Sequence, residues 1–124
     1  MQAVASYNHP LDHRDTPRYI VKSHFLGPEM HHKAQNYDVA LESYKQAIII
    51  YGNTDNEEII EQVFWARYQS GVINASKGDE KQAINIYAEL MKLPGNEDKL
   101  WKKLATENHR TILSKISYDD YMKE

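Results

Sequence analysis

The sequence predicts an all-α protein built from antiparallel helix hairpins. Apolar residues recur every three or four positions in several segments, which is the spacing of one helix face. Glycine and proline mostly stand at the breaks between these segments, and no stretch shows the alternation of a strand. A chain of 124 residues is long enough to form a continuous core without disulfides.

The first part of the chain predicts a leader and two short helices. Residues 1–15 contain Pro10 and no periodicity, so we expect a flexible N-terminal leader followed by a helical domain over residues 16–124. Thr16 and Pro17 favour a helix start, and the apolar residues that follow predict a helix over 18–26. Because a residue before proline avoids the helical region, Gly27-Pro28 is expected to end it, and a second short helix would reach Ala34.

Capping signals place the next two helices. Asn36 is expected to cap a helix over 37–51, which Gly52 would end in a left-handed conformation. Thr54 and Glu57 have the spacing of a capping box and predict a long helix over 55–76.

The segment from Phe64 to Pro94 predicts the central hairpin. The helix over 55–76 carries one apolar stripe, made of Ile60, Phe64, Tyr68, Gly71, Val72 and Ala75. Glycine inside a helix costs about 1 kcal/mol against alanine, so Gly71 indicates that another helix passes too close for a Cβ. After Lys77-Gly78, Asp79 is expected to cap a second helix, which carries Ala83 and Tyr87 and stops at Leu93-Pro94-Gly95.

The C-terminal part predicts a helix that closes the end of a helical stack. Asn96 is expected to cap it, and its apolar side comprises Leu100, Trp101, Leu104, Ala105, Ile112 and Ile116. Ser117 and Asp120 are spaced to cap one further turn.

The spacing of small and large residues resembles the tetratricopeptide repeat (TPR). Gly71, Gly78, Ala83, Tyr87 and a proline after the helix follow that pattern, and Ala105 lies 34 residues after Gly71, which is the repeat length of the family. Ala40-Leu41, Tyr44 and Ala47 resemble the second helix of a preceding repeat, and Trp101, Leu104 and Ala105 resemble the first helix of a following one. The sequence departs from the pattern at Arg67 and Leu90, and its first loop carries an insertion. The resemblance implies a short TPR-like α-solenoid with irregular ends; the alternative is an unrelated small helical bundle.

Composition limits the classes of function. The net charge is −3 with basic and acidic residues interspersed, so no nucleic-acid-binding face is expected. The chain has no cysteine, which excludes disulfides, thiolate metal sites and a cysteine nucleophile. Its longest apolar run is far shorter than the ~20 residues that span a bilayer, and no secretory signal is recognisable, so we expect a cytoplasmic protein.

The histidines are the one cluster with metal-binding chemistry. Five of the six histidines lie near the N-terminus, namely His9, His13, His24, His31 and His32. Pro10 interrupts the first pair and the last two point in different directions on a helix, so solvated histidines are the simpler interpretation. No nucleophile with a base, phosphate-binding glycine loop or defined carboxylate pair is recognisable, so neither enzymatic activity nor a cofactor is expected.

The TPR resemblance implies a partner-binding groove lined by the helix over 55–76. The residues on that face are Trp65, Tyr68, Gln69, Val72 and Ser76. The alternative is that Trp65 packs beneath the first repeat or the leader. The basic and asparagine clamp by which some TPR proteins hold peptide carboxylates is not matched. We therefore expect a non-catalytic interaction module, an adaptor or small chaperone that binds a peptide segment or helix. A helical metal-binding or enzymatic domain that uses the N-terminal histidines is the alternative.

Overall fold

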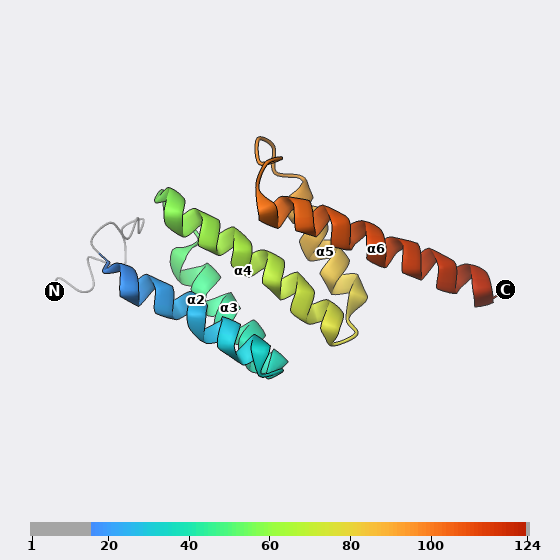
Figure 1. Ribbon diagram of the computed structural model, residues 1–124, viewed down its shortest axis with the longest axis horizontal. Coiled ribbons are helices and arrows are strands. Elements are labelled where there is room, and N and C mark those ends of the chain that lie inside the picture. The colour runs from blue at the N-terminus through green and yellow to red at the C-terminus, as the bar shows by residue number, and fades with distance from the viewer. Residues whose placement is uncertain (1–15, 124) are drawn as a thin grey trace. The chain divides into compact units, whose positions relative to one another are not determined.

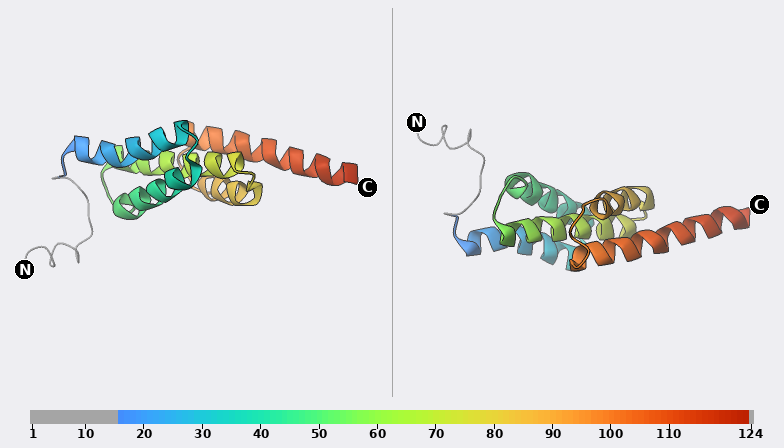
Figure 2. Two further views of the ribbon diagram at one scale, coloured as in Figure 1. Left: turned by 90° about the horizontal axis from the view of Figure 1, so that it is seen from below. Right: turned by 90° about the horizontal axis from the view of Figure 1, so that it is seen from above.

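The computed structural model describes residues 16–123. Within that range the regular secondary structure is entirely helical, with turns and short loops between the helices. These helices are α2 (Arg18–Lys33), α3 (Tyr37–Tyr51), α4 (Glu57–Ser76), α5 (Glu80–Met91) and α6 (Leu100–Lys123) (Figure 1). Successive helices run in opposite directions and pack as hairpins, as the pairs α2–α3 and α5–α6 show (Figure 2). The prediction of an all-α fold made of antiparallel helix hairpins is confirmed. The predicted leader lies outside the described residues.

The chain forms two compact units, Met1–Ala66 and Arg67–Glu124, and their boundary falls inside helix α4. Unit 1 therefore contains α2, α3 and residues 57–66 of α4. Unit 2 contains residues 67–76 of α4 together with α5 and α6. Each unit places one half of α4 beside a pair of other helices, and each is described by itself below.

The core of unit 1 is built from one face of each helix. These faces are spaced by three or four residues, as burial of one helical stripe requires. The buried residues are Val21, Phe25 and Pro28 on α2, Ala40, Tyr44, Ala47 and Tyr51 on α3, and Ile59, Val63 and Ala66 on α4. Tyr51 joins α3 to α2, because its ring lies 5.6 Å from that of Phe25 and its hydroxyl lies 2.6 Å from Nδ1 of His24.

Helix α2 is continuous, so the predicted break at Gly27-Pro28 is wrong. A proline inside a helix removes one hydrogen bond and costs about 3 kcal/mol in an exposed position. Pro28 is buried and follows Val21 and Phe25 on the same face of α2, so packing of its ring offsets that cost.

The same turn closes the α2–α3 hairpin and the central α4–α5 hairpin. Gln35 N–H donates to the carbonyl of His32 and Asn36 N–H to that of His31, the Schellman arrangement in which the intervening residue adopts positive φ. In the central hairpin Gly78 occupies the equivalent position with φ +91°, whereas the first hairpin has Gln35 at φ +64°. Gly78 is the residue expected there, but nothing in its side chain marks Gln35 as a left-handed residue.

The core of unit 2 centres on the contact between α4 and α5. Gly71 is buried, and a Cβ added to it would lie 2.5 Å from Cε1 of Tyr87. This confirms the predicted close approach at Gly71. The remaining core residues are Tyr68 and Ile73 on α4, Ala83 and Leu90 on α5, and Trp101, Ala105 and Ile112 on α6.

The predicted apolar stripe of α4 is displaced by one residue in unit 1. Ile59 and Val63 are buried, whereas their neighbours Ile60 and Phe64 are only half-buried. Because each pair consists of adjacent apolar residues, the spacing alone fits either choice. The buried stripe continues from Ile59 and Val63 to Ala66, which is fully buried.

Two helix starts differ from the predicted ones. The Asn56 side chain caps α4 by accepting from the N–H groups of Glu58 and Ile59, at 3.0 and 3.2 Å, so the Thr54–Glu57 capping box is wrong. Thr54 instead accepts from the N–H of Asn56, which fixes the turn before the helix. Helix α6 begins at Leu100 rather than directly after Asn96.

Among the other helix ends, the predicted cap of α5 is confirmed, whereas those of α3 and α6 differ from the prediction. Asp79 caps α5 as predicted, accepting from Gln82 N–H at 3.2 Å. Asn36 precedes α3 but makes no capping bond through its side chain, and Gly52 ends α3 in the right-handed region with φ −64°. Helix α6 continues past Ser117, so no separate last turn forms.

Candidate binding groove

A partly apolar groove in unit 1 contains the predicted site residue Trp65. It has a volume of about 290 Å³, and we call it the Trp65 groove. Its walls come from α2 and α4 and its floor from α3; the lining residues are Lys22, Phe25, Leu26, Glu29, Tyr44, Gln62 and Trp65. Trp65 is 37% exposed and Leu26 54%, whereas Phe25 and Tyr44 are buried. The groove therefore combines accessible apolar side chains with buried aromatic ones.

Helix α2 places charges of opposite sign along the groove. Lys22 and Glu29 are seven residues apart, which is two helical turns and about 10 Å along the axis. They lie on the same side of the helix, with Phe25 and Leu26 between them. An occupant of the groove thus meets a cation near one end and a carboxylate near the other.

The Tyr44 phenol at the floor of the groove is hard to ionise. Burial, and next the negative charge of Glu29, raise the pKa of Tyr44 to about 12 from the usual value of 10. Tyr44 therefore remains neutral over the whole physiological range.

The pKa of Tyr44 predicts a loss of stability at alkaline pH. Because the folded-state pKa lies above the unfolded one, this group stabilises the fold below pH 10 and loses that contribution as pH rises toward 12. Glu29→Gln is expected to lower the pKa partway, since burial remains. The measurement is an ultraviolet titration of phenolate absorbance, in which Tyr44→Phe identifies the late step. A late step that is unchanged in Glu29→Gln would contradict the placement of Glu29 beside Tyr44.

A second groove, in unit 2, contains two further predicted site residues. It also measures about 290 Å³, and we call it the Asn108 groove. It is lined by Val72, Ala75 and Ser76 of α4, Tyr87 of α5, and Asn108, Thr111 and Ile112 of α6. The Asn108 amide donates to the hydroxyls of Tyr68 and Tyr87, at 3.0 and 3.4 Å. The lining of this groove therefore offers hydrogen-bonding groups but, unlike that of the Trp65 groove, includes no charged side chain among the described residues.

The five predicted site residues occupy different environments. Trp65 belongs to unit 1, and the other four belong to unit 2. Val72 and Ser76 line the Asn108 groove, whereas Tyr68 is 7% exposed and supports it from within through Asn108. Gln69 is half-buried and lines neither groove.

Sequence reasoning missed the wall that α2 contributes. Lys22, Leu26 and Glu29 line the Trp65 groove together only because α2 is continuous through Pro28. A break at Gly27 would have put Glu29 on a different helix. Asn108 was also missed, although it lies three residues after Ala105, on the neighbouring side of the same helix.

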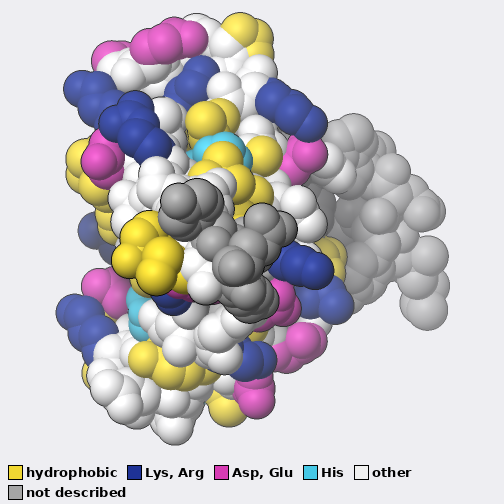
Figure 3. Space-filling model, turned by 90° about the vertical axis from the view of Figure 1, so that its right-hand side faces the viewer, with side chains coloured by type: hydrophobic (Ala, Val, Ile, Leu, Met, Phe, Trp, Pro, Cys, Tyr) yellow, Lys and Arg dark blue, Asp and Glu magenta, His cyan; other side chains and the backbone are white. Residues whose placement is uncertain are grey.

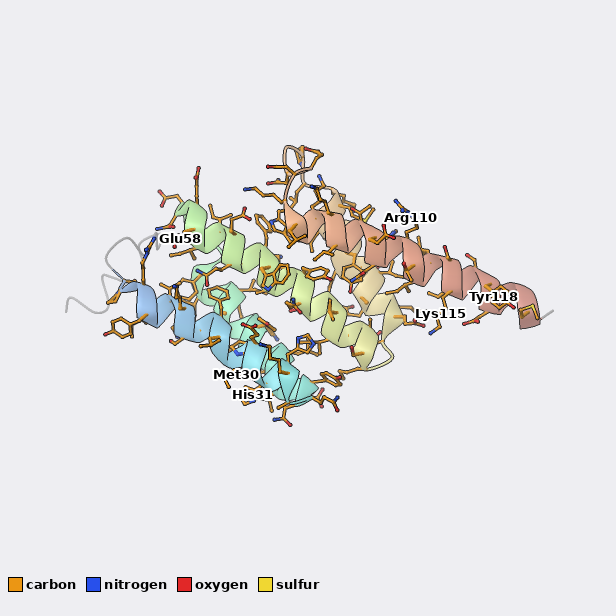
Figure 4. All side chains as sticks on the ribbon, viewed as in Figure 1. Met30, His31, Glu58, Arg110, Lys115 and Tyr118 are labelled. Carbon is orange, nitrogen blue, oxygen red and sulfur yellow. The ribbon has the colours of Figure 1, made fainter. Side chains whose placement is uncertain are left out.

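Two of the described histidines, His24 and His32, contact tyrosine side chains. Nδ1 of His24 hydrogen-bonds with Tyr51, and the ring of His32 packs edge-on against Tyr37 at 6.1 Å. Burial lowers the pKa of His32, although nearby Glu29 opposes that shift. His31 projects from the last turn of α2 (Figure 4). Within residues 16–123 no three His, Asp or Glu side chains are grouped as metal ligands. His9 and His13 lie outside the described residues.

Charges on the surface are mixed. On the face drawn in Figure 3, Lys and Arg side chains are interspersed with Asp and Glu rather than gathered into one patch. Ion pairs within units include Arg18–Glu58, at the starts of α2 and α4, and Lys115–Glu80. Figure 4 labels Glu58 and Lys115. None of the helices over the described residues combines the length and apolar character that a membrane span requires.

Comparison with known proteins gives no relative. No family model matches the chain, and neither a curated protein nor a solved structure is significantly similar to it.

Proposed function

We propose that this protein is a non-catalytic interaction module that binds a peptide segment or helix of a partner protein in the Trp65 groove. The observation that carries the proposal is the exposure of Trp65 and Leu26 beside a buried aromatic floor. Tryptophan is enriched among residues that dominate binding energy, and a rigid floor reduces the ordering cost of binding. A groove of this size accommodates one or two side chains of a partner.

A repeat architecture supports the same proposal. Four features of the α2–α3 hairpin recur 43 residues later in the α4–α5 hairpin. They are a buried residue that is unfavourable within a helix (Pro28, Gly71), a turn residue with positive φ (Gln35, Gly78), a buried alanine (Ala40, Ala83) and a buried tyrosine (Tyr44, Tyr87). Both alanines are fully buried, and each tyrosine lines the groove of its unit. Repeated hairpins that carry a groove on each unit are typical of helical-repeat proteins that bind peptides. On this proposal the protein is TPR-like and acts in the cytoplasm as an adaptor or small chaperone, with a protein or peptide partner rather than nucleic acid or membrane.

Replacing Trp65 by alanine tests the proposal. A peptide selected from a random display library on the full chain provides the ligand. We expect Trp65→Ala to weaken its binding by about 2 kcal/mol or more, roughly thirtyfold in Kd, because the indole supplies much of the contact area. The free energy of unfolding should fall by less than the ~3–5 kcal/mol that deletion of a fully buried aromatic costs, since the side chain is 37% exposed.

Ile49→Ala is the matched control for the Trp65 variant. Ile49 lies on α3 of the same unit, is 63% exposed and does not line the groove, so the change should leave affinity unchanged. A large loss of stability in Trp65→Ala, with the affinity of the folded fraction intact, would overturn the groove assignment.

A further inference from the structure

Helix α2 carries a second apolar surface, on the side away from the core of unit 1. Tyr19, Leu26 and Met30 are 72%, 54% and 62% exposed, although all three are large hydrophobic residues. Their spacing of seven and four residues places them along one side of the helix, and the buried residues of α2 lie on the opposite side. We call this surface the α2 stripe. Single exposed hydrophobic residues are ordinary, but a row of them along a helix is typical of a contact surface.

The charges beside the α2 stripe make it complementary to a second copy of itself. Lys22 and Glu29 flank the stripe on one side, two helical turns apart. A two-fold axis across the middle of α2 pairs two such helices antiparallel, and each Lys22 then faces Glu29 of the other copy. The midpoint between Lys22 and Glu29 lies only about one residue, or ~1.5 Å, from the midpoint between Tyr19 and Met30. One axis therefore matches the charges and the apolar residues together.

Both charged side chains are available for such a pairing. None of the ion pairs among the described residues involves Lys22. Glu29 pairs with Lys33, one turn further along α2, at 3.4 Å, and both side chains of that pair are exposed. An exposed pair of this kind contributes only about 0.3–0.5 kcal/mol. The Glu29 carboxylate can therefore take a second cation at little cost.

We infer that two copies of this chain associate through the α2 stripe, with their α2 helices antiparallel and Lys22 of each copy paired with Glu29 of the other. Tyr19 of one copy then lies against Met30 of the other, and the two Leu26 side chains meet near the axis. A helix of 16 residues is about 24 Å long, so the interface is small, and we expect a dissociation constant on the order of 100 µM. The inference goes beyond the proposed function and does not rest on it.

Charge reversal in the full chain tests the inference without a partner. Sedimentation equilibrium at concentrations up to about 1 mM, tenfold above the expected constant, measures self-association. Because the axis repeats each contact, Lys22→Glu and Glu29→Lys each replace two attractive contacts by repulsive ones. Each should weaken self-association at least about tenfold. The double variant exchanges both charges, restores both pairs and should associate like the parent. An equimolar mixture of the two single variants should do the same, as a heterodimer.

Two further variants separate the stripe from general effects. Lys45→Glu makes the same change in net charge on α3 of the same unit, where Lys45 is exposed, and should leave the dissociation constant within about twofold of the parent. Met30→Gln removes an apolar contact at both ends of the interface and should weaken self-association at least about tenfold. Met30 does not line the Trp65 groove, so this variant should bind the selected library peptide as the parent does.

Three results would overturn the inference. The first is a chain that stays monomeric at about 1 mM, tenfold above the expected constant, as it would if another protein covered the stripe. The second is a Lys45→Glu variant that associates as weakly as Lys22→Glu. The third is a mixture of the two single variants that associates no better than either alone. None of these measurements involves the affinity of the Trp65 groove, so the proposed function stands or falls separately on Trp65→Ala.

Discussion

Replacing Tyr87 by alanine is expected to lower the free energy of unfolding by about 3–5 kcal/mol, the range for deletion of a buried aromatic side chain. Tyr87 is 1% exposed, and its ring contacts Gly71 and lies 6.0 Å from that of Tyr68. Its hydroxyl accepts from Asn108, so the deletion opens a cavity and removes a link between α5 and α6. Denaturant unfolding followed by circular dichroism measures the effect.

Tyr87→Phe is the control that separates packing from hydrogen bonding. It keeps the ring and removes only the hydroxyl, so we expect a loss of about 0.5–1.5 kcal/mol. The bond from Asn108 to Tyr68 remains available in this variant. Equal losses in the two variants would show that the polar contact, rather than the volume of the ring, holds α5 in place.

Replacing Gly71 by leucine is expected to lower the free energy of unfolding by about 1–3 kcal/mol or more, because the Tyr87 ring already fills the space beside Gly71. A Cβ at Gly71 would lie 2.5 Å from the Tyr87 ring, and a leucine adds three more carbons beyond it. The midpoint of thermal unfolding should fall accordingly. Gly71→Ala tests the closest contact alone and should also destabilise, although alanine is the better helix former.

Gly27→Ala is the matched control for the glycine substitution. Gly27 also lies inside a helix, but a Cβ there would have no neighbour within 4 Å. We expect this change to alter stability by less than about 1 kcal/mol, because the gain in helix propensity is opposed by the clash between the new Cβ and the ring of the following Pro28. If Gly71→Ala altered stability as little or raised it, the close contact with Tyr87 would be refuted.

Local patterns predicted much of the fold. The spacing of Gly71, Ala83 and Tyr87 identified the central hairpin, because small residues facing large ones are what close helix packing requires. Asp79 was a reliable capping signal, since its carboxylate has a free N–H within reach at the helix start. The all-α fold follows from such local preferences.

The errors arose where packing overrides local preference. Pro28 is unfavourable within a helix by itself, and only the neighbours that bury its ring make α2 continuous. Thr54 and Asn56 are both good capping residues two positions apart, and the sequence gives no reason to prefer Asn56. The same applies to the candidate site: the TPR resemblance implied a groove face that includes Trp65, but the wall with Lys22 and Glu29 depends on the continuity of α2.

The Gly27-Pro28 pair also determines how α2 forms and opens. Together the two residues carry a propensity deficit of about 4 kcal/mol relative to alanine, so α2 is helical chiefly because Val21, Phe25 and Pro28 are buried. A helix of this kind gains structure late in folding and is among the first to open in local unfolding. Its amide protons would exchange faster than those of α3, and a ligand in the Trp65 groove would slow that exchange by holding one wall in place.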